Sequence, residues 1–505
     1  MTNVGFNRLW RALAVVALLV APTLAAASGV LRIATASGPP TLDPHFSNSR
    51  ATADTSFNLF EGLVGYAEDF SVHPQLAESW TISDDGLTYT FQLYPGILFH
   101  NGRTVTANDV KVSLERVLEI SPARTSISDI VSVEAVDELT VRIQLAQPAG
   151  PLLQHLATSN AVILPAEAIE GRPGGEADII GTGPFRFVEW LPDRHVRMAR
   201  FEDYVQRPGP PSGHVGARTA YVDEVFFVPV PEDSARANGL ETGEYHVADF
   251  LPYGAGRRLL QNPDTVITEL EQQMMVFAYL NNAEPRLTAN PVLRRAIQAA
   301  LNHDDMLAVA AEGYGALNPS YYFGGWYTDR GTENYNLKDP ELARQLLTDA
   351  GYAGQEIVIV TNTSFDVMYR SALMIERQLQ SVGVNTRLEV YDWPGSIAVR
   401  KQGEWDVFMS GHLLQIDPSV IEFHLRPASS PFKHDDDVVT DLFARARASS
   451  SPSERAELYA QLQEHTYETV PWIKLFDQNV FQGVRAEVDG YRPWPYMRAS
   501  DVRVD

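Results

Sequence analysis

Two runs in this 505-residue sequence combine residue types that could do chemistry. The first is Gly181-Thr182-Gly183-Pro184-Phe185, a glycine-rich turn of the kind that can hold a phosphate group. No Lys-Ser or Lys-Thr follows it, and Pro184 removes one of the amide donors that a phosphate would need. We therefore interpret this run as a tight turn and exclude a phosphate-binding loop.

The second run is His434-Asp435-Asp436-Asp437, which could attract a cation. It lacks the spaced oxygen ligands and the glycine of a calcium loop, so we predict a solvated loop. The sequence has no H-E-x-x-H and no G-x-S-x-G motif, and its lack of cysteine excludes disulfides, thiol catalysis and thiolate metal sites. We expect no metal ion, no cofactor and no catalytic residue.

The chain is acidic, with a formal net charge of −24 that is spread along the sequence. This charge argues against nucleic acid or an anionic membrane surface as a partner. A length of 505 residues with 45% hydrophobic residues allows more than one large core.

The N-terminus has the pattern of a cleavable export signal. Arg8 and Arg11 precede a short apolar stretch from Leu13 to Val20, and Ala25-Ala26-Ala27 is a cleavage site. The stretch is shorter than the roughly 20 residues that a membrane span requires. We predict a signal peptide over 1–27 and a mature protein in the periplasm, and the absence of cysteine excludes a lipoprotein anchor.

The elements that would position functional residues are clearest between Leu76 and Leu118. Thr88 to Tyr94 alternates apolar and polar residues, which predicts a half-buried strand after a turn at Ser83-Asp84-Asp85-Gly86. Thr106 stands three residues before Asp109 and predicts a capped helix that begins there.

The exact residues of this stretch are more informative than the spacing of its apolar and polar positions. Ala77–Trp80, Asp85–Phe91, Phe99–Gly102 and Thr106–Val110 resemble, in the same order, the shared motif of the extracytoplasmic solute-binding proteins of family 5, which serve peptide, nickel and related ABC importers. Similar matches follow along the chain, at Thr41-Leu42-Asp43-Pro44, at Glu61-Gly62-Leu63, at Gly181–Phe185 and at Pro471–Phe476.

The resemblance covers about Leu31 to Arg498 and implies an α/β protein shaped as a bilobal periplasmic-binding-protein clamshell with mixed sheets. It implies lobe one over 28–253, lobe two over 254–476 and a C-terminal return to lobe one over 477–505. Lobe one would include an extra, mostly antiparallel subdomain over 61–162. We expect the Pro- and Gly-rich run Arg207–Gly216 to be a surface loop.

Further elements follow from local patterns. Asn290 and Asp339 are predicted to cap helices that begin at Pro291 and Pro340, and Ser451 with Glu454 predicts a capping box. A helix is predicted from Ser371 to Val382. Strands are predicted at 28–36, 139–145, 161–164, 186–190, 222–230, 274–281, 357–361, 384–391, 406–410 and 471–476.

In a clamshell, ligand groups come from loops at strand ends. This places Asn48–Thr52, Gly181–Phe185, Asn362–Phe365 and Gly411–Pro418 at the cleft, and aromatic walls at Trp326, Tyr327 and Trp393. For each aromatic side chain, ordinary packing is the alternative. The candidate ligand-binding residues are Asn48, Arg50, Thr182, Trp326, Asn362, Trp393, His412, Leu414, Gln415 and Asp417.

The resemblance also bears on the ligand. Peptide binders of the family hold the ligand's amino group with an Asp three residues before an acidic-Pro pair, and the dipeptide binders hold the carboxylate with an Arg. Here the acidic-Pro pair is Asp417-Pro418, so these positions are Leu414 and approximately Asn362. A one-residue gap would instead make Asp417 the amine partner. We hypothesise that the ligand is not a simple dipeptide zwitterion.

The resemblance implies the substrate-binding component of an ABC importer, which captures a peptide or peptide-like solute and delivers it to a permease in the inner membrane. We expect a monomer that is not an enzyme. A longer peptide, a modified amino acid or opine, an oligosaccharide and a metal chelate remain alternative solutes. A secreted hydrolase and a sensory or chaperone-like role are the other functional classes, and a neighbouring permease gene would separate import from sensing.

Overall fold

The computed structural model describes residues 29–323, 326–413, 417–421 and 434–504. The predicted signal peptide over 1–27 and the candidate site residues Leu414 and Gln415 lie outside the described residues.

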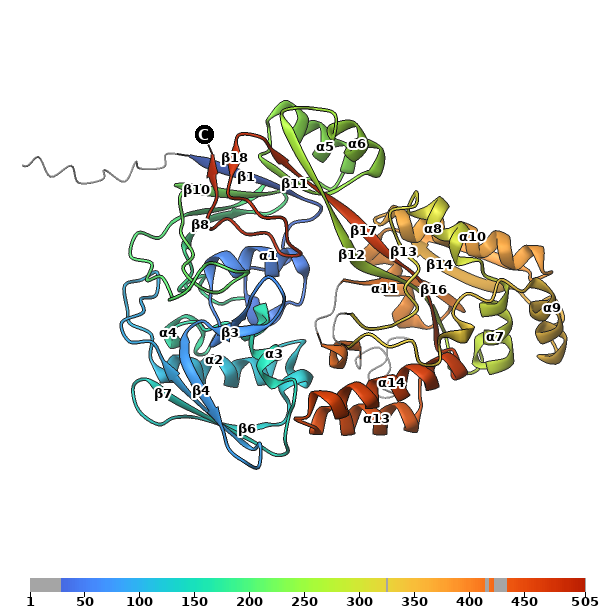
Figure 1. The fold of residues 1–505 in the computed structure, drawn as a ribbon, viewed down its shortest axis with the longest axis horizontal. Helices are drawn as coiled ribbons and strands as arrows, with labels where there is room; N and C mark the ends of the chain where they lie inside the picture. Colours follow the sequence, from blue (N-terminus) through green and yellow to red (C-terminus); the bar gives the residue numbers. More distant parts are fainter. Residues whose placement is uncertain (1–28, 324–325, 414–416, 422–433, 505) are drawn as a thin grey trace, which may run out of the picture.

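One large mixed sheet runs through both halves of the molecule (Figure 1). Its order is β15 (Thr386–Tyr391), β14 (Ile357–Asn362), β16 (Val407–Leu413), β12 (Thr265–Leu280), β17 (Trp472–Arg485), β11 (Val247–Leu251), β1 (Val30–Thr35), β10 (Glu224–Pro229), β9 (His195–Arg200) and β8 (Phe185–Leu191), with β13 (Gly315–Ala316) beside β17. We call the half with β1 and β8–β11 lobe one and the half with β14–β16 lobe two.

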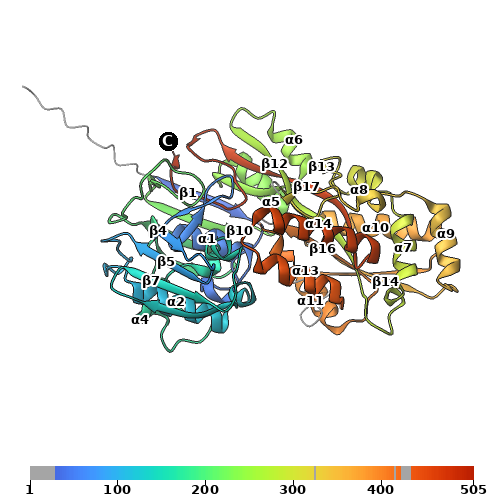
Figure 2. The same cartoon turned by 60° about the horizontal axis from the view of Figure 1, so that its bottom comes forward.

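Only β12 and β17 take part in both halves of this sheet, within the described chain. Thr265–Leu270 pairs with 480–485 next to β11, and Met274–Tyr279 pairs with 472–478 next to β16. The register shifts between Leu270 and Met274, so the strands change lobe at an irregular point. Figure 2 shows the two lobes side by side with β12 and β17 between them.

A second sheet belongs to lobe one alone. Its order is β4 (Ala77–Ile82), β5 (Thr88–Leu93), β7 (Thr140–Leu145) and β6 (Ile130–Ala135), and every pair is antiparallel. Tyr89, Phe91 and Leu93 point into its core, as the alternation predicted. Two small pairs complete the strands, β2 (Val64–Tyr66) with β3 (Val72–Pro74) and β18 (Val488–Asp489) with β19 (Arg503–Val504).

Helices pack against these sheets in both lobes. In lobe one they are α1 (Arg50–Leu59), α2 (Ala107–Ile120), α3 (Leu152–Leu156), α4 (Ala166–Ile169), α5 (Asp233–Thr242) and α6 (Tyr253–Leu259). In lobe two they are α7 (Pro291–Ala300), α8 (His303–Ala310), α9 (Pro340–Asp349), α10 (Asp366–Ser381), α11 (Trp393–Gln402), α13 (Asp437–Ala448) and α14 (Pro452–Thr469). The strand order, the two lobes and the antiparallel subdomain confirm the predicted clamshell fold.

The predicted helix starts are also confirmed by their caps. Thr106 and Asp109 form a complete capping box on α2, and the side chains of Asn290 and Asp339 accept the first amides of α7 and α9. Ser451 accepts from the Glu454 amide, but the Glu454 carboxylate binds the Ser449 hydroxyl, so this box is half formed.

Several local predictions differ from the structure, in whole or in part. Residues 161–164 form only an isolated bridge at Val162, because this short segment links a 3₁₀ turn at Ser159–Ala161 to α4. Helix α10 begins five residues before the predicted Ser371. Residues 434–436 are a loop, as predicted, but His434 is buried and Asp436 caps α13 by accepting amides from Val438 and Val439. The run Arg207–Gly216 is a loop, as predicted, but only part of it is at the surface: residues 213–216 are buried, and the buried Arg207 bonds to Glu61 at 2.6 Å.

Candidate functional site

Lobe one carries a group of charged residues that we call the charge cluster: Arg50, Asp54 and Asp249, which join α1 to β11. Figure 1 shows α1 in the part of lobe one nearest lobe two. Arg50 lies at the first position of α1, one turn before Asp54, and Asp249 lies on β11. The Arg50 guanidinium is 2.8 Å from Asp249 and 3.3 Å from Asp54. Gln482 of β17 donates to Asp249, so the cluster adjoins one of the strands shared by both lobes.

The charge cluster is only partly paired. Two carboxylates share one guanidinium, whose Nε atom lies 3.3 Å from Asp54 without making a hydrogen bond. Burial raises the pKa of Asp54 to about 6, although Arg50 and the Met497 amide oppose this shift. Side chains that are 17% and 5% exposed keep limited access to solvent. The cluster therefore places both signs of charge close together, with Arg50 the most exposed of the three side chains.

Sequence reasoning named Arg50 but missed its two partners. The spacing of Arg50 and Asp54 at i and i+4 was a usable signal, because such residues meet on one face of a helix. Asp249 lies on β11, and nothing in the sequence indicated that this strand would meet α1.

In lobe two, the structure joins Trp326 and Asp417 through Arg455 of α14, which the sequence analysis did not name. One guanidinium nitrogen of Arg455 lies 2.7 and 2.8 Å from the two Asp417 oxygens, and the guanidinium carbon lies 4.8 Å from the Trp326 ring centre. Asp417 is 2% exposed. Its charge is already neutralised inside the protein.

The candidate residues Asn362 and Trp393 meet around one turn. Asn362 is fully buried at the end of β14, where its side-chain oxygen accepts the Phe365 amide and its side-chain nitrogen contacts the Met368 sulfur. The Trp393 amide donates to Ser364, and its ring packs edge-on against Phe365. The Asn362 side chain thus stabilises the turn before α10.

The remaining candidates are dispersed. Asn48 is exposed, whereas Thr182 is 1% exposed with a hydroxyl group that has no hydrogen-bond partner. Gly181 and Gly183 allow close packing, since an added Cβ would lie 2.0 and 2.5 Å from carbonyl oxygens of Leu59 and Asn58. As ligand-binding residues, all of these positions stay predictions.

His412 was expected in a loop, and this expectation was wrong. It lies in β16, where it is 7% exposed and contacts the Tyr279 hydroxyl group and the Phe277 ring. Burial lowers the pKa of His412 to about 3, so its ring is neutral at physiological pH. The strand continues three residues past the predicted end because it pairs with Met274–Leu280 of β12.

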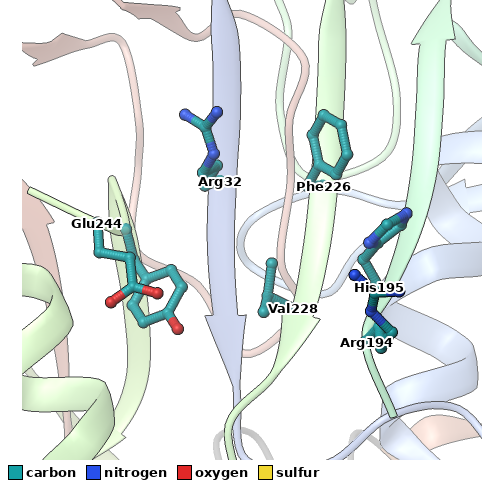
Figure 3. Close-up of a pocket in the computed structure, with 7 residues that line it drawn as sticks. Arg32, Arg194, His195, Phe226, Val228 and Glu244 are labelled. Carbon is teal, nitrogen blue, oxygen red and sulfur yellow. The ribbon is translucent and has the colours of Figure 1, made fainter. Parts of the chain in front are cut away.

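A pocket of about 330 Å³ lies elsewhere, on the β1–β10–β9 part of the sheet (Figure 3). Its lining includes Arg32, Phe226 and His195 on neighbouring strands, with Glu244 at the β11 side. These strands lie on the side of β11 away from lobe two, and none of the predicted site residues lines the pocket. We therefore do not assign the solute site to it.

No described helix is both long enough and apolar enough to cross a membrane. Within the described residues, His, Asp and Glu side chains do not gather in groups of three or more that could hold a metal ion.

The sequence, fold and length of this chain resemble those of known binding proteins. The glutathione-binding protein GsiB of Pectobacterium atrosepticum is 28% identical over 530 residues, which cover 98% of each chain. The periplasmic binding protein DppA of Helicobacter pylori, solved with the peptide STSA, is 26% identical with a TM-score of 0.80 and covers 94% of this chain and 98% of that one. A Pseudoalteromonas dipeptide-binding protein has a TM-score of 0.84, covers 94% and 100%, and at 21% identity bears on the fold alone.

The sequence profile of "Bacterial extracellular solute-binding proteins, family 5 Middle" matches residues 71–425, which is well over half of the chain. Proteins of this family bind solutes and deliver them to the permeases of ABC importers, and both the family and the relatives above are binding proteins rather than enzymes. On this match, and on the two-lobed fold that agrees with it, the chain belongs to family 5 of the bacterial extracellular solute-binding proteins.

Proposed function

We propose that this protein captures a charged, peptide-like solute between its two lobes and passes it to the permease of an ABC importer. The charge cluster carries this proposal, because Arg50 can attract a carboxylate while Asp54 and Asp249 can attract an amino group. A peptide or a γ-linked peptide presents both groups. Relatives named for glutathione and a neighbour solved with a tetrapeptide support the same class of solute.

The arrangement in lobe two favours a role for lobe one in charge recognition. Asp417 is bonded to Arg455, and Asn362 is used within its own turn. A free amino group at Asp417 would have to compete with the Arg455 guanidinium, which is 4% exposed and serves that one carboxylate, whereas Arg50 is 17% exposed and is shared by two carboxylates. We therefore infer that Asp417 positions its loop and that the charge cluster holds the charged ends of the solute.

A thermal-shift and calorimetric panel tests the proposal. The panel contains glutathione, a dipeptide, Ser-Thr-Ser-Ala, its acetylated and amidated form, an oligosaccharide and a nickel–histidine chelate. A ligand at 100 times its Kd adds about 2.7 kcal/mol to the stability of the folded state, which moves the melting curve. We expect a shift with a free peptide-like compound and a smaller one with the blocked peptide. A shift with only the oligosaccharide or the chelate would overturn the proposal.

Variants of the charge cluster test recognition by comparing free peptides with their blocked forms. Arg50→Gln should weaken binding of a peptide with a free carboxylate more than binding of the same peptide as its amide. Asp54→Asn should raise the melting temperature at pH 7.5, because it removes a buried carboxylate whose pKa burial raises, while weakening binding of a free amine. Arg142→Gln, at an exposed pair in the subdomain, is the matched control.

We also infer that the protein works in the periplasm as a monomer after removal of 1–27. The N-terminal pattern and a neighbour described as periplasmic support this location. Cell fractionation, N-terminal sequencing of the mature chain and light scattering test the three statements separately.

A further inference from the structure

The two lobes touch at a place away from the shared strands, which we call the rim contact. On lobe one it consists of Asp129, Gly150 and His155, and on lobe two of Ser419 and Arg447. The Gly150 amide donates to the Arg447 carbonyl at 3.1 Å, and the Arg447 guanidinium lies 3.6 Å from Asp129. The His155 ring nitrogen Nε2 lies 3.2 Å from the Ser419 hydroxyl group.

The lobes approach closely at this contact. A Cβ atom added to Gly150 would lie 2.2 Å from the carbonyl oxygen of Ser449 in lobe two, a distance that no side chain tolerates. His155 is 7% exposed and Ser419 is 8% exposed, so both are buried where the two lobes meet. The contact therefore has the packing of a fitted interface.

A buried chain of bonds supports the lobe-two side. The Ser419 amide donates to Asp417, which is held by Arg455 of α14. Arg455 also donates to the carbonyl of Ala446 at the end of α13. The position of Ser419 is thus fixed by the α13–α14 pair, and the contact with His155 joins α3 of lobe one to that unit.

His155 is the titratable group at the centre of this interface. The charged groups that face it are Asp417, Arg455 and Arg447, all from lobe two. Burial lowers the pKa of His155 to about 4, Asp417 opposes the shift, and the two arginines add to it. If the lobes separate, His155 reaches water and regains its ordinary value near 6.5.

We propose that the rim contact is a proton-sensitive latch, which holds the lobes together while His155 is neutral and releases them when His155 takes up a proton. A base that is harder to protonate in the closed form favours closure above its open-form pKa and loses that contribution as the pH falls. The closed-to-open ratio should therefore fall between pH 6.5 and 4, by roughly 30-fold at pH 5 relative to pH 8.

The test follows the distance between the lobes without any solute, so it does not depend on the proposed function. The chain has no cysteine, so Ser132→Cys and Gln345→Cys, at exposed positions in the two lobes, place one label in each. We expect the label distance to grow as the pH is lowered from 7.5 to 5, and to grow less in His155→Gln, whose amide can still bond to Ser419 without titrating.

Two further variants complete the test. His73→Gln removes an exposed histidine of lobe one and should behave like the wild type. Ser419→Ala should lower the closed fraction at pH 7.5 and keep the pH dependence. Equal pH profiles for the wild type and His155→Gln would overturn the latch, as would a label distance that does not change with pH. Melting curves at pH 7.5 verify that each variant is folded.

Discussion

Lys474 and Asp477 form an ion pair in β17 whose two side chains are fully buried. The Lys474 nitrogen lies 2.8 Å from Asp477 and donates to the Ser320 carbonyl at 2.5 Å, and Asn318 donates to the other Asp477 oxygen at 2.8 Å. Burial lowers the pKa of Lys474 and raises that of Asp477, while each charge opposes the shift of the other. The pair is balanced only while both charges are present.

Lys474→Met should therefore destabilise the protein by about 3–5 kcal/mol, because it leaves Asp477 buried without its counter-charge. Urea unfolding measures the loss. The double variant Lys474→Met/Asp477→Asn removes both charges and should recover a large part of the stability. If the double variant loses as much stability as Lys474→Met and Asp477→Asn lose together when measured singly, the two charges do not act as a pair.

Prediction of the site was limited because the sequence does not show whether a polar side chain already has its bonding partners within the protein. The sequence placed Asn362 at the end of a strand, which is correct, but its side chain completes a local turn. It placed Asp417 near the ligand, but Arg455, 38 residues later, occupies both carboxylate oxygens. Such partners come from distant segments, so local pattern cannot reveal which polar groups remain available to a solute.

At the level of elements, prediction succeeded where a cap or an alternating pattern marks a boundary. Asp339 and Asn290 fixed the starts of α9 and α7, and the Thr88–Tyr94 alternation fixed β5. Strands β12 and β17 were predicted too short, because their outer halves are rich in polar residues such as Glu269 and Gln482. These halves are held by pairing with each other and with β11, which is a tertiary effect.

The side chain of Asn479 bridges the irregular point where the pairing of β12 with β17 shifts register. Gln272 has a φ of 52°, and its amide donates to the Asn479 side-chain oxygen at 2.8 Å. The Asn479 side-chain nitrogen donates to Glu269 at 2.6 Å, and its backbone carbonyl accepts from the Tyr253 hydroxyl group at 2.9 Å. Asn479 thus supplies the bonds that regular pairing would otherwise supply where the strands change lobe.

Asn479→Ala should loosen this crossing point. Loss of a hydrogen bond worth about 1 kcal/mol should speed hydrogen exchange of the Gln272 amide roughly fivefold, while amides in the core of β14 stay unchanged. Exchange measured by mass spectrometry on overlapping peptides separates the two regions. Uniformly faster exchange in β14 as well would mean that the variant lowers global stability, and unchanged exchange at Gln272 would contradict the role of Asn479.

At the scale of the whole molecule, the two lobes share one sheet but have separate cores. Ile359, Val407 and Leu475 belong to a core of lobe two, whereas Leu31 and Phe185 belong to a core of lobe one. Two crossing strands can bend without disturbing either core, which is the property that closure around a solute requires. Capture by closure then depends on what each ligand contacts in each arrangement.

Both lobes also bury neutral histidines, and this should govern the response of the molecule to acid. Burial lowers the pKa of His45, His100 and His155 to about 4 and of His303 and His412 to about 3, and it lowers the pKa values of His214 and His246 as well. Unfolding would return each to about 6.5, so the unfolded chain binds more protons below that pH.

The free energy of unfolding should consequently be highest above pH 6.5 and fall as the pH drops toward 4, by about 1.4 kcal/mol per pH unit for each proton taken up. Asp54, Asp477 and Asp501, whose pKa values burial raises, act in the opposite direction, but seven histidines outnumber them. Urea unfolding followed by tryptophan fluorescence at pH 7.5, 6.5 and 5.5 measures the slope. A midpoint that stays constant over this range would contradict the buried neutral histidines. If the midpoint falls at acid pH and His155→Gln abolishes only a small part of that fall, the lost stability belongs to the histidines within the two lobes. It is then separate from opening at the rim contact.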